Sequence, residues 1–133
     1  MLLYRDLFYE MQIQYLEENR NMLKKVKCLI HGEYVFCNPF EDLVYLLEAV
    51  IELLELESND FTWSSWANAS VAVSEIRMLI KKTNRKIMDN KTLGVIFAAT
   101  GPLQEVSFGS GWGDAFVKIA DIYDRIEEKI VKT

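Results

Sequence analysis

Residues 38–57, NPFEDLVYLLEAVIELLELE, constrain the fold more than any other stretch, because they predict a long helix that is apolar over more than half of its circumference. Asn38 can cap such a helix, Pro39 suits its first position, and Glu41 stands three residues after the cap. The apolar side is formed by Leu43, Leu46, Leu47, Val50, Ile51, Leu53 and Leu54. A helix of this kind must be covered on several sides, so we expect it at the centre of the core.

The rest of the chain is also dominated by helical periodicity. Further helices are predicted over residues 3–26, 62–86, 92–99 and 112–131. Residues 27–37 break this pattern, since they are rich in β-branched and aromatic side chains, and they predict either a short β-hairpin or an irregular connection. The sequence therefore predicts an all-α fold of four to five helices in one compact domain that covers all 133 residues, 1–133.

Composition and charge exclude several classes of protein. Half of the residues are hydrophobic, which argues against disorder, and the net charge of −5 argues against general binding to nucleic acids. The chain opens without the features of a secretory signal, and no stretch reaches the roughly 18 apolar residues that span a membrane. Cys28 and Cys37 are interpreted as reduced thiols. We therefore expect a cytoplasmic protein that binds neither nucleic acid nor membrane.

No residue pattern in the sequence identifies a reaction or a cofactor. Cys28, His31 and Cys37 are zinc-type ligands, but the paired spacing of zinc sites is missing, even if Glu33 is counted as a fourth ligand. We interpret the two thiols as small packing side chains and His31 as part of a turn. The sequence therefore predicts no metal, no cofactor and no catalytic residues, and the protein is not expected to be an enzyme.

A glycine-rich segment, residues 107–114, offers the main alternative to that interpretation. Its spacing is G-x-G-x-G rather than the G-x-G-x-x-G of dinucleotide-binding loops, and the Walker lysine is absent. We interpret the segment as a loop whose glycines turn the chain into the last helix. The alternative is a small-ligand-binding protein or an enzyme with a pocket at this loop, lined by Glu105, Ser107 and Asp114.

Charge is strongly segregated along the chain. Residues 41–60 carry seven acids and no base, whereas residues 77–91 carry six bases and one acid. One side of the predicted helix, opposite its apolar side, carries four acids that we call the acidic stripe: Glu41, Glu48, Glu52 and Glu55. Such a stripe is explained by solvation, by neutralisation against the basic segment, or by docking of a basic partner.

In its small size, acidity, helical content and acidic stripe, the chain resembles the immunity proteins that neutralise nuclease toxins in bacterial contact-dependent inhibition and colicin-like systems. The resemblance implies a stoichiometric inhibitor whose acids mimic the phosphates that a nuclease cleft binds. The expected partner is therefore a basic protein toxin of the nuclease class. The predicted partner-binding residues are Glu41, Glu48, Glu52, Glu55, Asp60, Trp63 and Trp66.

The tryptophans and the last helix carry further expectations. Trp63 and Trp66 are three residues apart, on the same side of a predicted helix start, where they either fill the core or anchor an interface. The last helix carries a narrow apolar seam that suits packing against another helix, which leaves both a monomer and a homodimer open. Reversal of Glu48 and Glu52 to lysine is expected to weaken the complex without unfolding the domain.

Overall fold

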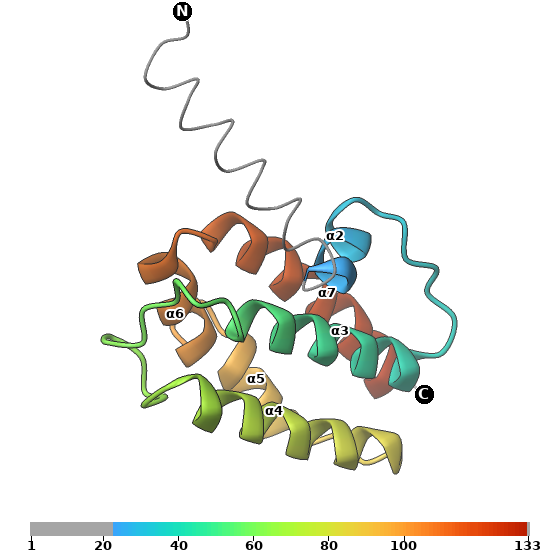
Figure 1. Cartoon of the computed structure of the whole chain (residues 1–133). Helices are drawn as coiled ribbons and strands as arrows, with labels where there is room; N and C mark the ends of the chain where they lie inside the picture. Colours follow the sequence, from blue (N-terminus) through green and yellow to red (C-terminus); the bar gives the residue numbers. More distant parts are fainter. Residues whose placement is uncertain (1–22, 133) are drawn as a thin grey trace, which may run out of the picture.

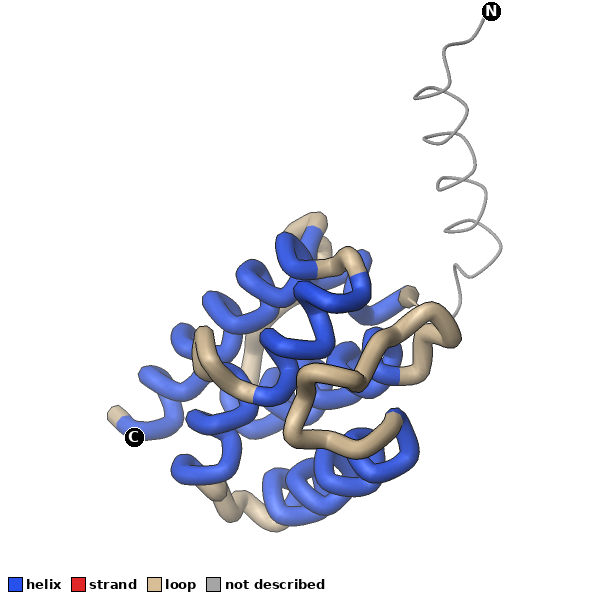
Figure 2. Tube along the Cα trace, turned by 90° about the vertical axis from the view of Figure 1, so that its left-hand side faces the viewer, coloured by secondary structure: helices blue, strands red, loops and turns tan. Residues whose placement is uncertain are grey.

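The protein is described here over residues 23–132 by a computed structural model, in which helices are joined by turns and irregular connections (Figure 1). The helices are α2 (Lys24–Ile30), α3 (Pro39–Leu54), α4 (Ala69–Asn84), α5 (Asn90–Phe97), α6 (Pro102–Ser110) and α7 (Gly113–Val131). Residues 23–132 contain no strand, as Figure 2 also shows, so the all-α prediction is confirmed. Most of the predicted helix 3–26 lies outside the described residues. None of the described helices is long and apolar enough to cross a bilayer.

The prediction for residues 27–37 is wrong for its first part, because residues 27–30 continue α2. The rest of the segment is an irregular connection without a strand, so the β-hairpin is not formed. Tyr34 attaches this connection to α3, because its hydroxyl donates a hydrogen bond of 2.8 Å to the buried carboxylate of Asp42. The Tyr34 ring also stacks on Tyr45, with ring centroids 4.2 Å apart. Tyr34 therefore packs against a helix, and the ring of Phe36 makes an edge contact with Tyr34.

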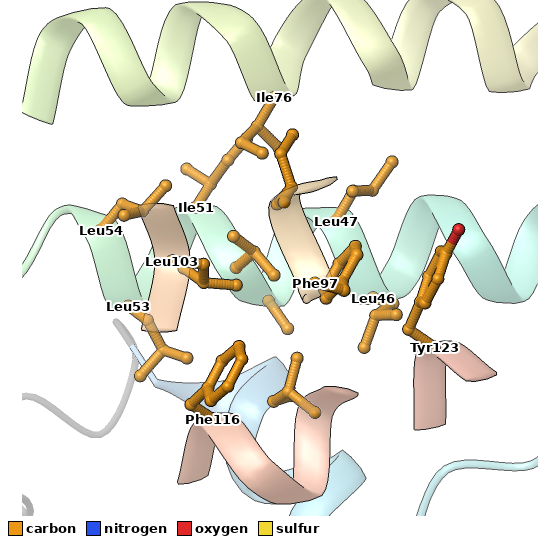
Figure 3. Packing of buried hydrophobic residues seen from close by; sticks show 14 of the residues in the cluster. Leu46, Leu47, Ile51, Leu53, Leu54, Ile76, Phe97, Leu103, Phe116 and Tyr123 are labelled. Atoms are coloured by element: carbon orange, nitrogen blue, oxygen red, sulfur yellow. The ribbon is translucent and has the colours of Figure 1, made fainter. Parts of the chain in front are cut away.

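The central position predicted for the long apolar helix is confirmed, since α3 packs against α2, α4 and α7. Its seven predicted apolar residues are all buried. Asn38 caps the helix as predicted, because its side-chain oxygen accepts hydrogen bonds from the N–H groups of Phe40 and Glu41 at 2.9 and 3.3 Å. Figure 3 shows part of the core, in which α3 side chains lie between Ile76 of α4 and Phe116 of α7.

Helix α4 begins later than predicted. The sequence predicts a start near residue 62, but the helix starts at Ala69, where the side-chain oxygen of Asn68 accepts the N–H of Val71 at 3.0 Å. Residues 55–68 form an irregular connection, which we call the tryptophan loop after the two tryptophans in it. These tryptophans therefore do not share one side of a helix.

Helix α4 also ends slightly earlier than predicted, at Asn84. Lys86 takes a left-handed conformation with a φ of 64°, which turns the chain out of the helix. The N–H of Ile87 then bonds back to the carbonyl oxygen of Lys82 at 3.0 Å, a usual way of closing a helix. As a result Ile87 lies beyond the helix and is 53% exposed.

The glycine-rich segment 107–114 is not the loop that the sequence predicts, because its first residues complete α6 and its last residues begin α7. Gly111 makes the turn between the two helices with a φ of 85°, a conformation in which a side chain would be strained. Trp112 occupies the position before α7 and provides no side-chain cap. The glycines therefore serve a helix–turn–helix corner.

The apolar seam predicted on the last helix faces the core of its own chain. The buried residues of α7 are Phe116, Ile119, Tyr123 and Ile126. The ring of Tyr123 stacks on that of Phe97 in α5, with centroids 4.4 Å apart. Because the seam is covered within the chain, it is not available to join two copies of the protein.

Candidate functional site

Two members of the acidic stripe, Glu48 and Glu52, line a cleft that is formed by three helices. The cleft has a volume of about 330 Å³ and is lined by Lys25, Glu48, Ile51, Glu52, Arg77 and Ile80. Helix α3 contributes the carboxylates, while α2 contributes the lysine and α4 the arginine. The neighbouring helices therefore bring two cations of the same chain to the stripe.

Glu52 supplies the cap of α2. Its Oε1 accepts hydrogen bonds from the N–H groups of Lys25 and Val26, each at 3.0 Å. These groups belong to the first turn of α2, where Leu23 occupies the N-cap position and offers no side-chain acceptor. Burial raises the pKa of Glu52 above its ordinary value and outweighs the opposite effect of the two backbone hydrogen bonds and of Lys25. This member of the stripe is thus engaged in joining α2 to α3.

Two further members of the stripe are paired with cations. Glu48 forms an ion pair with Nζ of Lys25. Glu55 lies 3.6 Å from the guanidinium of Arg77. Pairs as exposed as these contribute between about 0 and 1 kcal/mol to stability. Glu41 is exposed at the start of α3 and takes part in none of the ion pairs of residues 23–132. Of the explanations for the stripe, neutralisation by cations of the same chain is therefore observed for Glu48 and Glu55.

The structure separates the two tryptophans that the sequence places together. Trp66 is 4% exposed, and its indole N–H donates a hydrogen bond of 2.7 Å to Glu75 on α4. It belongs to the core and is not a surface anchor. Trp63 is 77% exposed, and tryptophan is one of the residue types enriched at the centres of protein interfaces.

Asn59 attaches the tryptophan loop to the end of α3. Its side-chain nitrogen donates hydrogen bonds to the carbonyl oxygens of Leu53 and Leu54 at 2.7 and 3.1 Å. Its side-chain oxygen accepts the indole N–H of Trp112 at 2.8 Å. Asn59 therefore links the last turn of α3 to the corner between α6 and α7.

Two more hydrogen bonds attach the loop to α6, one from a residue before Trp63 in the sequence and one from a residue after it. Before it, the N–H of Asp60 bonds to Oγ of Ser110 at 2.8 Å. After it, the hydroxyl of Ser64 donates to the carbonyl oxygen of Pro102 at 3.2 Å. The two acceptors lie at opposite ends of α6. The loop therefore follows α6 at one end of the molecule, where Figure 1 shows it projecting between α3 and α4.

The tryptophan loop is acidic as well as apolar. Glu57 and Asp60 are exposed, and the loop contains no lysine or arginine. Hydrogen bonds from Thr62 hold the pKa of Asp60 below its ordinary value, so this carboxylate stays charged at neutral pH. Of the predicted partner-binding residues, Asp60 and Trp63 are thus brought together on one exposed segment.

A shallow groove between α4 and α5 begins where the tryptophan loop ends. It has a volume of about 580 Å³, and Ser65 and Trp66 of the loop contribute to its lining. Val71 of α4 and Val95 of α5 also line it, and they are 48% and 57% exposed. The groove could not be predicted from the sequence, because both valines have the spacing of ordinary buried residues of a helix. Their exposure follows only from how α4 and α5 pack.

The alternative pocket at the glycine-rich segment is not formed by the residues predicted for it. Glu105 and Ser107 are two residues apart on α6 and therefore point to nearly opposite sides of the helix. Ser107 is buried, and its hydroxyl donates to the carbonyl oxygen of Gln104 at 2.7 Å. Asp114 is exposed on α7. Within residues 23–132, these three side chains therefore do not face one common cleft.

The zinc-type residues are spread over α2 and the connection that follows it. Cys28 is half-buried, whereas His31 and Cys37 are exposed, and both thiols are free. Within residues 23–132, no group of three or more His, Cys, Asp or Glu side chains is arranged to hold a metal ion.

The tryptophan loop and the groove beside it are thus the residues that the geometry assembles into a candidate site. No protein-family model, no curated protein and no solved structure matches the chain.

Proposed function

We propose that this protein is a stoichiometric binding protein, an inhibitor of the immunity type, that holds a basic protein partner at the tryptophan loop and the adjoining groove. The observation that carries the proposal is Trp63, which is 77% exposed on a loop attached to α6 on both sides of it. The partner that this proposal expects is a basic bacterial toxin of the nuclease class, bound in the cytoplasm.

An exposed tryptophan on an ordered loop is well suited to anchor an interface. Tryptophan is enriched among the few residues that dominate binding energy, because binding removes the large apolar surface of its ring from water. A loop that is ordered before binding loses little conformational freedom in the complex, which favours affinity. The exposed Val71 and Val95 in the neighbouring groove extend the apolar surface.

The charge of the loop favours one kind of partner. Glu57 and Asp60 precede Trp63, and no base of the loop offsets them. Opposite charges on two proteins increase the rate at which they associate, and like charges disfavour binding. A basic protein surface therefore suits this loop. The carboxylates that contact the partner in this proposal therefore belong to the tryptophan loop and not to the acidic stripe of α3.

Replacement of Trp63 by alanine is expected to weaken partner binding at least about tenfold, as loss of a central aromatic anchor does. The partner is first captured from cells of the source organism with the tagged full-length protein, then purified. Its affinity for the wild-type protein and the variant is measured by isothermal titration calorimetry. Since Trp63 is exposed, the free energy of unfolding should change by less than about 0.5 kcal/mol.

Val35→Ala is the matched control, because Val35 is 75% exposed on a different connection. This variant should bind the partner as tightly as the wild-type protein. Equal affinity of the Trp63→Ala and wild-type proteins would refute the proposal, as would a purified partner that is acidic.

A further inference from the structure

A second groove lies at the end of α4 that is remote from the tryptophan loop. It has a volume of about 350 Å³ and is lined by Met78, Lys81, Lys82, Arg85 and Ile87, which we call the basic groove. Lys81 and Lys82 lie three and four residues after Met78 on one side of α4, and Arg85 and Ile87 follow directly after the helix end. The opposite side of α4 is packed on α3, which leaves the basic groove facing solvent.

Two cations of the basic groove lack an acidic partner among the residues that the structure describes. Lys82 is paired with Asp89 at 3.1 Å. Lys81 and Arg85 are exposed and take part in none of the ion pairs of residues 23–132. Lys81 lies in the last turn of α4 and Arg85 directly follows the helix, so the groove brings together two like charges that repel each other. Carboxylates from outside the chain would relieve that repulsion.

Apolar side chains flank these cations. Met78 is 63% exposed and Ile87 is 53% exposed, and neither is packed against the core. Favourable interaction with the helix dipole explains cations near the end of α4, but it does not explain two exposed apolar side chains beside them. Methionine suits surfaces that receive a partner, because its flexible and polarizable side chain adapts to different shapes.

We propose that the basic groove binds an acidic segment of a second protein, which inserts an apolar side chain between Met78 and Ile87 while its carboxylates contact Lys81 and Arg85. This inference goes beyond the proposed function, because it concerns a different partner chemistry and a different surface. Met78, the groove residue nearest to the tryptophan loop along α4, lies ten positions after Asn68, which is about 15 Å along the helix.

An acidic protein segment suits the groove better than a nucleic acid or an anionic membrane. The net charge of −5 repels both polyanions over the rest of the surface. A phosphate backbone would also leave Met78 and Ile87 in water, and the groove offers no aromatic ring on which a base could stack. A short segment that carries both carboxylates and an apolar side chain matches both features of the groove.

The test is a titration of the isotopically labelled full-length protein with two synthetic peptides of equal length and charge, followed by NMR. One peptide consists of glutamate and leucine, and the other has serine in place of leucine. The glutamate–leucine peptide is expected to shift the amide signals of residues 78–87 and to bind at least about tenfold more tightly than the serine peptide. Combined Lys81→Glu and Arg85→Glu substitutions should weaken this binding by a similar factor.

Combined Lys24→Glu and Lys118→Glu substitutions are the matched control, since they change the net charge equally at exposed lysines on α2 and α7. They should leave most of the affinity intact, and Trp63→Ala should leave all of it, which separates this test from that of the proposed function. The inference is overturned if signals of residues 78–87 do not respond, or if the serine peptide binds as well. It is also overturned if duplex DNA or phosphatidylserine vesicles bind the groove more tightly, or if sedimentation shows that the groove joins two copies of the chain.

Discussion

Replacement of Gly101 by alanine is expected to destabilise the protein by about 3 kcal/mol, because the added methyl group has no room. Gly101 is buried between α5 and α6, and a Cβ atom at this position would overlap the backbone carbonyl oxygen of Val95. It would also lie only 3.2 Å from the carbonyl oxygen of Ile96. Backbone atoms of a helix cannot move aside as a flexible side chain can, so the corner between the two helices must open.

Gly94 provides a matched control within the same corner. It lies inside α5, and a Cβ atom there would meet nothing within 4 Å. Gly94→Ala is therefore expected to stabilise the protein by about 0.5–1 kcal/mol, since alanine favours a helix interior over glycine. Urea unfolding followed by circular dichroism measures both variants. The close approach of α5 to α6 would be refuted by a Gly101→Ala protein as stable as the wild type.

Replacement of Glu52 by alanine is expected to reduce the free energy of unfolding by about 2 kcal/mol, because it leaves two N–H groups of α2 without an acceptor. Those groups are the N–H of Lys25 and Val26, both bonded to the Glu52 carboxylate. Glu52→Gln keeps one acceptor oxygen and should lose less. Glu57→Ala removes an exposed glutamate of the tryptophan loop and should leave stability unchanged, which makes it the control.

The pH dependence of this contribution follows from the direction of the pKa shift. Burial raises the pKa of Glu52 above its ordinary value of 4.5, so the folded protein binds its proton more tightly than the unfolded chain does. The part of the stability that comes from tighter proton binding in the folded state is complete below that ordinary value and is lost as pH rises through the higher folded value, and it is separate from the two hydrogen bonds of the cap. The stability of the wild-type protein relative to Glu52→Gln should therefore fall as pH rises above 4.5. A relative stability that rises over this range would contradict the assignment.

The role of Glu52 also changes what its reversal to lysine can reveal. The sequence predicts that lysines at Glu48 and Glu52 weaken a complex without unfolding the domain. Because Glu52 caps α2, a lysine there would place a positive charge at the positive end of that helix. Loss of binding by such a variant would report the loss of α2 packing as much as the loss of a contact with a partner.

The position and inner side of α3 could be predicted from the sequence because the signals are local. The Asn38 cap and the following proline mark the helix start, and the spacing of the leucines marks its buried side. The start of α4 could not be predicted in the same way. The hydrogen bonds of Asp60 to Ser110 and of Ser64 to Pro102 join residues that are 50 and 38 positions apart. These distant contacts keep the residues before Ala69 in a loop, although their local periodicity predicts a helix from residue 62.

In the candidate site, too, local features could be predicted and contacts between distant residues could not. Helical periodicity placed the acidic stripe on one side of α3, but the partners of the stripe come from other helices. No pattern within residues 41–60 indicates that Lys25 and Arg77 reach it. The exposure of Trp63 and the burial of Trp66 depend likewise on how the tryptophan loop lies on α6. Sequence reasoning identified the residues involved, but not which of them are already engaged.

The cap that Glu52 provides has a consequence for the order in which the protein forms. Helix α2 has seven residues, fewer than the roughly 12–15 that an isolated helix needs to persist in water. Its acceptor lies 27 residues further along the chain than Lys25. During synthesis α2 therefore leaves the ribosome before the glutamate that completes its first turn, and it must wait for α3 to emerge and fold against it.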